Sequence, residues 1–354
     1  MKVLIVGSRF GEVYLNAFFE HQEGLTLAGI LSTGSVSSQH LAHDFAVPLY
    51  TDIKQVPADI DIVCIIVRST VVGGAGTHLA KHFLQRGCHV IQEHPVHPDD
   101  ISALQHLALQ QGVHYWVNSF YPYTAAGQCW IQNVRLLREQ LLQRSPVLYH
   151  MYTSRQLLYS SLALFLLSSR AIDIHVSVLP SADQNFNMVL LKWQNETAII
   201  FLQSTLDQQQ PDLHSFIMHK QIIVWPDGTL CLESSYGAIT WQPTFYFEHN
   251  NEKSLSQRRD EIDINEPISQ VLITAPQNWR DTFEQEGVQG IIYVLQSLRS
   301  VIAGEKIPVD LQPEHQLKVA ELWQRILQAV GREKSISGVA PKRVSNQLLQ
   351  QEDL

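Results

Sequence analysis

Short apolar runs alternate with helical patterns along the first 120 residues of the chain. The runs are almost continuous, which is typical of strands in a parallel sheet that helices cover on both faces. We predict strands at Val3–Val6, Leu25–Leu31, Ile60–Val67, His89–Gln92 and Val113–Asn118. The segments between them predict helices at Glu12–His21, Ser38–Phe45, Ala75–Arg86 and Asp99–Gln111. Strand–helix–strand units of this length indicate right-handed crossovers and an α/β fold with a doubly wound parallel sheet.

The hydrophobic pattern changes after residue 120. Residues 186–247 are rich in strand patterns, with hairpin turns predicted at Asn195-Glu196 and Pro226-Asp227-Gly228. Helical patterns occur at 128–144, Leu157–Leu167, Thr282–Ile302 and Gln316–Val330. We therefore expect three parts, namely a parallel-sheet domain over 1–120, an α+β domain with a mostly antiparallel sheet over 121–332, and a polar C-terminal tail over 333–354.

A glycine-containing turn separates the first predicted strand from the first predicted helix. The turn consists of Gly7, Ser8, Arg9, Phe10 and Gly11. Glycine lets the backbone approach a pyrophosphate, whose charge is favourable near a helix N-terminus. The turn departs from the pattern Gly-x-Gly-x-x-Gly, because Arg9 and Glu12 replace its second and third glycines. The place of the turn between strand and helix predicts a dinucleotide-binding loop, and a plain turn at a strand end is the alternative.

The loop after the second predicted strand favours NADPH over NADH. An NAD site usually has an acidic residue there, which binds the ribose 2′-hydroxyl. In this chain the first carboxylate after that strand is Asp44, and the loop offers hydroxyl and amide groups from Ser32, Thr33, Gly34 and Ser35. With Arg9 or Arg68 nearby, these donors suit a 2′-phosphate. The alternative is that Ser37 or Ser38 caps the next helix.

Two further stretches carry a family resemblance. The third predicted strand ends in Val67, Arg68 and Ser69, and the fourth leads into Glu93-His94-Pro95-Val96-His97. This order resembles the Gfo/Idh/MocA oxidoreductases, in which the fourth strand leads into Glu-Lys-Pro with a catalytic lysine. Here His94 replaces that lysine. The resemblance covers residues 1–125, and it implies an NADPH-binding Rossmann domain whose cofactor also contacts Val67, Arg68, Ser69 and Glu93.

Three separated motifs are more specifically similar to thiazolinyl imine reductases of siderophore biosynthesis, of the yersiniabactin and pyochelin type. The motifs span Gly7–Phe18, Val67–Gly74 and Glu93–His97. The resemblance implies NADPH-dependent reduction of a thiazoline to a thiazolidine. The intermediate would be tethered to a carrier protein of a nonribosomal peptide synthetase. The family resemblance also implies a homodimer formed through the open face of the antiparallel sheet.

Reduction of a cyclic C=N needs a hydride at carbon and a proton at nitrogen. Ligands of open α/β sheets lie at the carboxyl ends of the strands, and there His94 follows the fourth strand and Tyr121 the fifth. Both are candidate catalytic residues. A phenol has a reference pKa of about 10 and needs tuning by nearby charge, whereas histidines exchange protons near neutral pH. The sequence leaves open which of the two donates the proton.

The same stretch also allows a metal cluster of Glu93, His94 and His97. We disfavour this alternative and expect no metal, because Pro95 breaks the helix that would align the two imidazoles.

Composition and charge narrow the class of protein. The formal net charge of −9 argues against nucleic acid as a partner. The four cysteines are far apart, which is typical of free thiols in a reducing cytoplasm. We find neither an apolar run long enough to cross a bilayer nor a signal-peptide pattern, so we expect no membrane contact.

Two alternative functions remain. The first is a Gfo/Idh/MocA-type dehydrogenase of a sugar or cyclitol, which is disfavoured because the lysine is absent. Sugar dehydrogenases of that group also carry an Asp and a His on a helix of the second domain, and the corresponding stretch Gln156–Ser169 contains neither. The second alternative is a non-catalytic sensor that binds NADP and signals to a protein partner.

Overall fold

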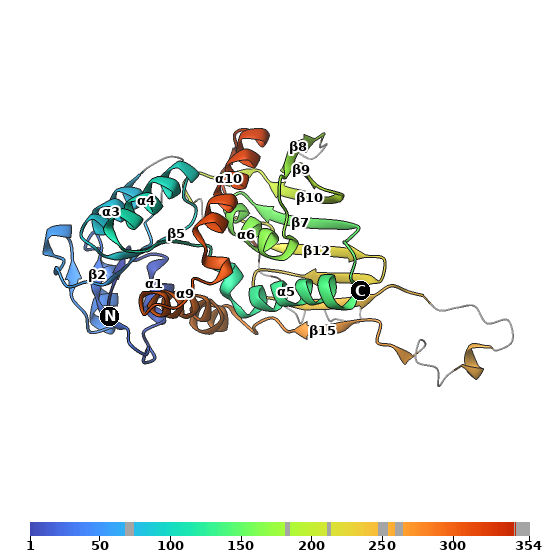
Figure 1. The fold of residues 1–354 in the computed structure, drawn as a ribbon, viewed down its shortest axis with the longest axis horizontal. Coiled ribbons are helices and arrows are strands. Elements are labelled where there is room, and N and C mark those ends of the chain that lie inside the picture. Colours follow the sequence, from blue (N-terminus) through green and yellow to red (C-terminus); the bar gives the residue numbers. More distant parts are fainter. Residues whose placement is uncertain are drawn as a thin grey trace.

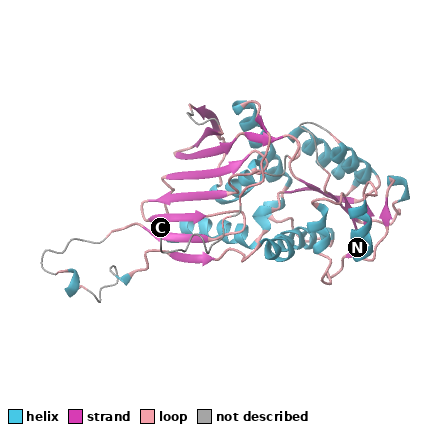
Figure 2. Ribbon diagram, turned by 180° about the vertical axis from the view of Figure 1, so that it is seen from behind, coloured by secondary structure: helices cyan, strands magenta, loops and turns pink. Residues whose placement is uncertain are grey.

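The computed structural model describes residues 1–67, 74–180, 185–210, 214–246, 254–258, 265–342 and 344. The chain forms two halves, each built around its own large sheet, with the N-terminal half at the left of Figure 1 and the larger sheet at the right. The same arrangement is seen from behind in Figure 2. The fold class expected from the sequence is confirmed.

The N-terminal sheet is parallel throughout. Its strands are β1 (Lys2–Val6), β2 (Thr26–Leu31), β3 (Leu49–Tyr50), β4 (Ile62–Ile65), β5 (His89–Glu93) and β6 (Tyr115–Asn118). They lie in the order β3-β2-β1-β4-β5-β6, so the strand order reverses between β1 and β4. This reversal is where doubly wound sheets bind ligands, at the carboxyl ends of the strands. The sequence missed β3, because a two-residue edge strand is too short to produce a pattern.

Helices cover both faces of this sheet. They are α1 (Gly11–Asn16), α2 (Val36–Asp44), α3 (Ala75–Gln85) and α4 (Pro98–Gln111). Helix α1 is shorter than predicted, since the sequence indicated a helix up to His21. Beyond Asn16 the backbone N–H groups of Phe18 and Phe19 bond carbonyls three residues back, and the side chain of Gln22 donates to the carbonyl of Ala17 at 2.8 Å. The chain thus leaves the helix through tighter turns.

The second half is built on an eight-stranded sheet in the order β15-β14-β13-β12-β7-β10-β9-β8. Its strands are β7 (Leu148–Ser154), β8 (His175–Leu179), β9 (Phe186–Trp193), β10 (Glu196–Gln203), β12 (Lys220–Trp225), β13 (Gly228–Leu232), β14 (Ile239–Pro243) and β15 (Gln270–Ile273). Only the pair β7 and β10 is parallel. The two predicted hairpins are confirmed, since β9 pairs with β10 and β12 with β13 in antiparallel register.

Helices lie on one face of the large sheet (Figure 1). They are α5 (Ala125–Leu136), which continues as a π-helical turn (Leu137–Leu141), α6 (Leu158–Ser169) and α10 (Pro313–Val330). Helix α9 (Gly287–Ile302) follows α8 (Trp279–Asp281) and a second π-helical turn (Thr282–Glu286), and packs against α1. Helix α10 contacts both α4 and α6. The C-terminal helices therefore join the two halves.

Short elements complete the fold. In the described part of the chain, 3₁₀ turns lie at Ile53–Gln55, Tyr121–Tyr123, Leu255–Gln257 and Val309–Leu311. The region interpreted as a polar tail contains a short strand, β16 (Lys334–Ile336), which pairs with β11 (Thr205–Asp207). Gly338 extends this attachment, because its backbone N–H donates to Asp207 at 2.9 Å.

The four cysteines are free thiols, as expected from their spacing, and three of them are buried. Among the residues described above, no helix is both long and apolar enough to cross a lipid bilayer.

Candidate active site

The turn after β1 requires glycine. Gly7 has a φ of +103°, and a Cβ at this position would lie 2.5 Å from the carbonyl oxygen of Ile66. The same Cβ would lie 3.4 Å from a methyl group of Val67, so the structure brings two predicted cofactor-binding residues together. The hydroxyl groups of Ser8 and Ser32 lie 3.1 Å apart and link the ends of β1 and β2. The residues present therefore fit a dinucleotide at the point where the strand order reverses.

The remaining predicted cofactor residues are placed around this turn. Gly11 begins α1 and is buried, whereas Arg9 and Thr33 are exposed. The ring of Phe10 packs edge-on against Phe120, with 5.5 Å between centroids. Arg68 and Ser69 lie outside the described residues.

The serine loop after β2 also caps a helix. Ser35 is the N-cap of α2 and accepts a hydrogen bond from the backbone of Ser38 at 3.2 Å. The alternative drawn from the sequence placed this cap at Ser37 or Ser38, whereas the structure places it at Ser35. Gly34 has a φ of +82°, and its carbonyl accepts from the side chain of Gln39 at 2.9 Å.

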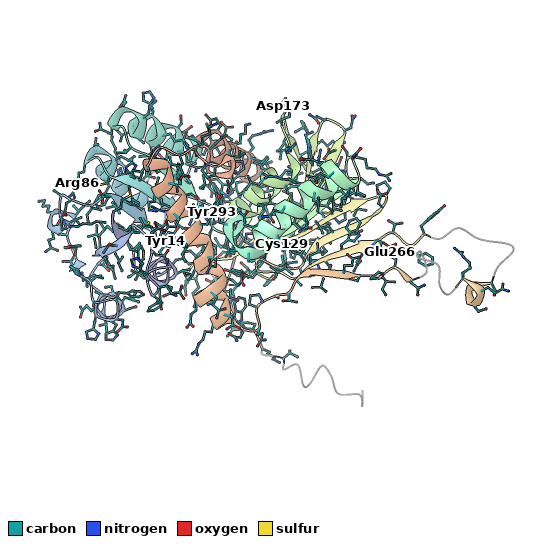
Figure 3. The ribbon with its side chains drawn as sticks, turned by 60° about the horizontal axis from the view of Figure 1, so that its bottom comes forward. Tyr14, Arg86, Cys129, Asp173, Glu266 and Tyr293 are labelled. Atoms are coloured by element: carbon teal, nitrogen blue, oxygen red, sulfur yellow. The ribbon has the colours of Figure 1, made fainter. Side chains whose placement is uncertain are left out.

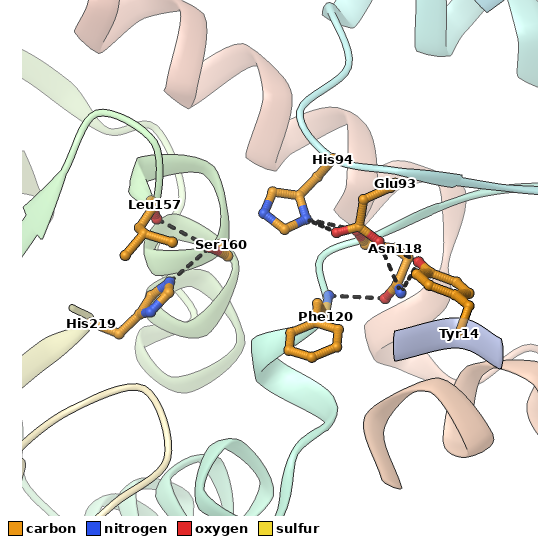
Figure 4. Close-up of polar contacts among 8 residues, drawn as sticks. All are labelled: Tyr14, Glu93, His94, Asn118, Phe120, Leu157, Ser160 and His219. Atoms are coloured by element: carbon orange, nitrogen blue, oxygen red, sulfur yellow. Dashed lines mark hydrogen bonds and ion pairs between the residues drawn. The ribbon is translucent and has the colours of Figure 1, made fainter. Parts of the chain in front are cut away.

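Glu93 and His94 form an ion pair at the end of β5. Nδ1 of His94 lies 2.8 Å from Oε1 of Glu93 and 2.9 Å from the backbone carbonyl of Asn118. Both side chains are about nine-tenths buried, with 11% of Glu93 and 8% of His94 exposed. Because Nδ1 faces two acceptors, it carries a proton, and Nε2 is the nitrogen left for chemistry. Figure 4 shows that this second nitrogen points away from Glu93, toward the side of α6 and His219.

Tyr14 and Asn118 hold the other oxygen of Glu93. The phenol of Tyr14 donates to Oε2, and the amide of Asn118 donates to the same oxygen at 3.4 Å and to the Tyr14 hydroxyl at 2.5 Å. Burial, followed by the charge of Glu93, raises the pKa of Tyr14 well above its usual value, so this phenol stays protonated. Tyr14 lies on α1, beside α9 (Figure 3). We call Tyr14, Glu93, His94 and Asn118 the strand-end cluster.

A strained turn positions Tyr121. Phe120 has φ +60° and ψ −71°, and the backbone N–H of Tyr121 donates to the carbonyl of Ser119 at 2.8 Å. These values describe a γ-turn of the rare, strained type. The amide oxygen of Asn118 stabilises the turn by accepting from the backbone of Phe120 at 2.9 Å. The strand-end cluster and the turn that presents Tyr121 are thus connected through Asn118.

The second half contributes a facing set of side chains. Tyr159 on α6 stacks on His94, with 5.4 Å between ring centroids and an angle of 23°. His219, just before β12, lies with its ring centroid 4.0 Å from that of Tyr121. The ring of Tyr236 also packs on Tyr121, with 5.7 Å between the ring centroids. We call Tyr159, His219 and Tyr236 the facing residues.

Electrostatic interactions connect the two sides. Burial raises the pKa of Tyr121 to about 12, against a hydrogen bond from Tyr236 that lowers it, and Glu93 raises it further. Burial lowers the pKa of His219 to about 3, and the nearby His94 lowers it too. The structure therefore brings His94 and Tyr121 to one place, between the ends of β5 and β6 and the second half.

Sequence reasoning missed most of the residues around this pair. Tyr14 lies within the first motif and Asn118 ends the fifth predicted strand, but their roles depend on contacts between separate elements. His219 and Tyr236 lie about 100 residues or more along the chain from Tyr121, and no pattern marks them.

His97 does not join the cluster. Its Nδ1 accepts from the backbone of Asp99 at 3.3 Å as the N-cap of α4, and its Nε2 lies 2.6 Å from the side-chain amide of Gln324 on α10. Within the described parts of the chain, no group of three or more His, Cys, Asp or Glu side chains is arranged to hold a metal ion.

A separate surface hollow lies elsewhere. It has a volume of about 630 Å³, between α2 and the segment that leads into β3, and His43 is its one ionisable lining residue. We place the candidate active site at the strand-end cluster instead, because buried titratable groups from both halves converge there.

Two family models match different parts of the chain. Residues 1–119 match the sequence model of the Gfo/Idh/MocA oxidoreductase family, described as an NAD-binding Rossmann fold. This match supports an NAD(P)-dependent oxidoreductase whose first half is similar to that family. Residues 144–242 match the C-terminal domain of Irp3-like thiazolinyl imine reductases. The family resemblance inferred from the three motifs is thus confirmed.

Solved structures share the fold at low sequence identity. UDP-N-acetylglucosamine 3-dehydrogenase GnnA from Acidithiobacillus ferrooxidans is 13% identical, with a TM-score of 0.64, over 93% of this chain and 97% of the other. An oxidoreductase from Agrobacterium radiobacter, in complex with NAD⁺, L-tartaric acid and magnesium, is 14% identical, with a TM-score of 0.63, over 93% and 96%. No curated protein sequence matches the chain.

Proposed function

We propose that the protein uses NADPH to reduce a thiazoline ring to a thiazolidine, on an intermediate tethered to a carrier protein. The observation that carries this proposal is the ion pair of Glu93 and His94 at the end of β5, near enough to Tyr121 for the charge of Glu93 to raise the pKa of that phenol. The match of residues 144–242 to Irp3-like thiazolinyl imine reductases supports the choice of substrate. The product requires one hydride on the imine carbon and one proton on the ring nitrogen.

Residues of the first half would hold the cofactor. Gly7 permits the close approach of the pyrophosphate, and the Ser8–Ser32 pair with its neighbouring loop offers hydroxyl groups and no carboxylate to a 2′-phosphate. When bound, the nicotinamide supplies the hydride. The choice of NADPH over NADH is part of this proposal.

His94 is the proton donor of the proposed reaction. The carboxylate of Glu93 holds the Nδ1–H group and stabilises the imidazolium form, in which Nε2 also carries a proton. Nε2 then gives its proton to the ring nitrogen of the substrate, and Nδ1 keeps its own. Tyr159 stacks on the imidazole and fixes its plane. A buried acid oriented by a carboxylate can transfer a proton without rearrangement.

Tyr121 orients the substrate in this scheme. With a pKa raised to about 12 by burial, its phenol is a weak acid at neutral pH. Tyr236 acts as donor toward Tyr121, so the hydroxyl proton of Tyr121 is left for an acceptor atom of the substrate other than the ring nitrogen, whose single lone pair takes the proton of His94. The candidate proton donors therefore narrow to His94, and Tyr121 is assigned to hydrogen bonding with the substrate.

The proposal also covers the oligomeric state of the protein and its location in the cell. The face of the large sheet opposite α5, α6 and α10 carries half-exposed rings, among them Tyr152 and Phe201, which stack 4.7 Å apart. We expect a second copy of the chain on this face and a cytoplasmic location that suits the free thiols. Sedimentation velocity tests the homodimer, which a monomer at micromolar concentration would contradict.

A sugar or cyclitol dehydrogenase is the second candidate, since GnnA acts on UDP-N-acetylglucosamine and shares the fold. Against it, α6 presents serine, tyrosine and aliphatic side chains and carries neither an aspartate nor a histidine. A test that separates the candidates follows NADPH absorbance with a thiazoline thioester, beside NADP⁺ reduction with a panel of sugars and cyclitols. Oxidation of NADPH by the thiazoline is expected. Reduction of NADP⁺ by a sugar, without turnover of any thiazoline, would favour the dehydrogenase.

A sensor without catalytic activity would bind NADPH and its protein partner in the absence of any turnover. Under that alternative, the variants His94→Ala and Tyr121→Phe bind the cofactor and the partner like the unaltered protein, and there is no rate to lose. Under our proposal they keep cofactor affinity and lose turnover.

A further inference from the structure

His219 is a fully buried histidine whose two ring nitrogens both have partners. Nε2 lies 2.7 Å from the hydroxyl of Ser160 on α6, and Nδ1 lies 2.7 Å from the hydroxyl of Ser235 in the loop after β13. No part of its surface is exposed. Figure 4 shows His219 next to Ser160, on the opposite side of the site from His94.

The hydrogen bonds fix one neutral form of the ring. The hydroxyl of Ser160 donates its single proton to the carbonyl of Leu157 at 3.1 Å, so its oxygen accepts from Nε2–H of His219. Nδ1 then carries no proton and accepts from the hydroxyl of Ser235. Every proton in this chain of bonds has an acceptor. The neutral form also avoids a second positive charge close to His94.

His219 cannot donate a proton to the substrate while these bonds are intact, because both of its ring nitrogens are already hydrogen-bonded to serine hydroxyls. Its ring instead lies against the phenol ring of Tyr121, with 4.0 Å between centroids and an angle of 41°. Tyr236 and Phe120 pack on other sides of Tyr121, at 5.7 and 4.9 Å. Burying an imidazole and two serine hydroxyls costs more desolvation free energy than burying an aliphatic side chain of similar size. The need to fill space beside Tyr121 therefore does not by itself explain why a histidine stands at position 219.

We propose that His219 is a positioning residue for Tyr121: the bonds from Ser160 and Ser235 lock its neutral ring in one orientation, and that ring holds the phenol of Tyr121 toward the substrate. This inference rests on the proposed function, since it assigns the orientation of the substrate-side phenol to a residue of the second half. His219 thereby ties the placement of Tyr121 to α6 and to the large sheet.

The first test is a double-mutant cycle on reduction of the thiazoline thioester. We expect His219→Ala to lower kcat/KM by about 10- to 100-fold when Tyr121 is present, because a displaced orienting group is costly. In a Tyr121→Phe background the same change should cost less than about twofold, because both substitutions remove one function. His106→Ala is the control, since His106 is exposed on α4 in the first half. Equal losses in both backgrounds would overturn the proposal.

The second test does not depend on turnover. 3-Fluorotyrosine placed at position 121 should give one sharp ¹⁹F resonance that shifts and broadens in His219→Ala and is unchanged in His106→Ala. An unchanged resonance in His219→Ala would overturn the inference. If His219→Ala does not fold, Ser235→Ala replaces it with the same expected directions and the same contradicting results. If the unaltered protein does not turn over any thiazoline but the ¹⁹F resonance still shifts in His219→Ala, the proposed function is wrong and the positioning role of His219 is retained.

Discussion

Glu93 holds His94 by its Nδ1 atom at 2.8 Å, and both side chains are shielded from solvent by the junction of the two halves. The two residues are neighbours in sequence at the end of β5, and the carbonyl of Asn118 on the adjacent strand β6 accepts from the same nitrogen. The acid and the carboxylate that orients it therefore arise from one strand end, and the next strand completes their geometry.

Replacing Glu93 by Gln tests this relationship. The amide can still accept from Nδ1 but carries no charge to stabilise the imidazolium form, so we expect kcat to fall by about 10- to 1,000-fold. Glu321→Gln, at an exposed position of α10, is the control. Steady-state kinetics with the thiazoline thioester measure the effect. A kcat equal to that of the unaltered protein would contradict the role of Glu93.

Replacing Gly7 by Ala should abolish cofactor binding. An added Cβ would lie 2.5 Å from the carbonyl of Ile66, at a φ that disfavours side chains. Gly112→Ala is the matched control, because Gly112 also has a positive φ, +68°, and a Cβ there meets nothing within 4 Å. Gly112→Ala should lose about 1 kcal/mol of stability from backbone strain, and Gly7→Ala should lose more because its Cβ also clashes with the backbone. Only Gly7→Ala should lose NADPH binding in fluorescence titrations, and retained affinity would refute the proposed phosphate loop.

Ser32→Asp tests the choice of cofactor. A carboxylate beside Ser8 would repel a 2′-phosphate and bind a ribose 2′-hydroxyl, so the preference for NADPH over NADH should fall by about 10-fold or more. Ser32→Asn has nearly the same size without the charge and should change the preference far less. The ratio of the two dissociation constants is the readout. If the unaltered protein binds NADH more tightly than NADPH, the proposed cofactor is wrong.

The stability of the protein should fall in mild acid because of His219. Its pKa is lowered to about 3 in the folded protein by burial, against about 6.5 in an unfolded chain. Between these values the unfolded chain binds a proton that the folded protein does not, so the free energy of unfolding falls as the pH falls. This histidine contributes a slope of at most about 1.4 kcal/mol per pH unit. Urea denaturation from pH 7 to 4 should show a flatter dependence for His219→Phe, and an identical slope would contradict the neutral buried ring.

Much of the first half was predictable from sequence, for a physical reason. The strands β1, β4, β5 and β6 are buried on both faces and so leave apolar runs that single out strands. The place of Gly7 between a strand and a helix indicated the phosphate turn, and the strand ends indicated His94 and Tyr121. The helix after Gly7 was overestimated, because local periodicity does not register the turn that ends α1 at Asn16.

The surroundings of the site were not predictable in the same way. The hydrogen bond from Tyr14 to Glu93 joins residues 79 apart in sequence, and Asn118 joins this pair from a third element. The contact of His219 with Tyr121 depends on how the large sheet is ordered, which turn signals alone do not determine. Such contacts are determined by tertiary packing, so a single sequence shows which residues are present but not which of them are in contact.

The central claim is that a hydride from NADPH and a proton from His94 are added across a cyclic C=N. Mass spectrometry of the product, after turnover of a thiazoline thioester with NADPH deuterated at both C4 positions, tests it most directly. The account predicts a thiazolidine that carries one deuterium on carbon, formed by the unaltered protein and at least about 100-fold more slowly by His94→Gln. An unlabelled product, or an equal rate for His94→Gln, would contradict the account.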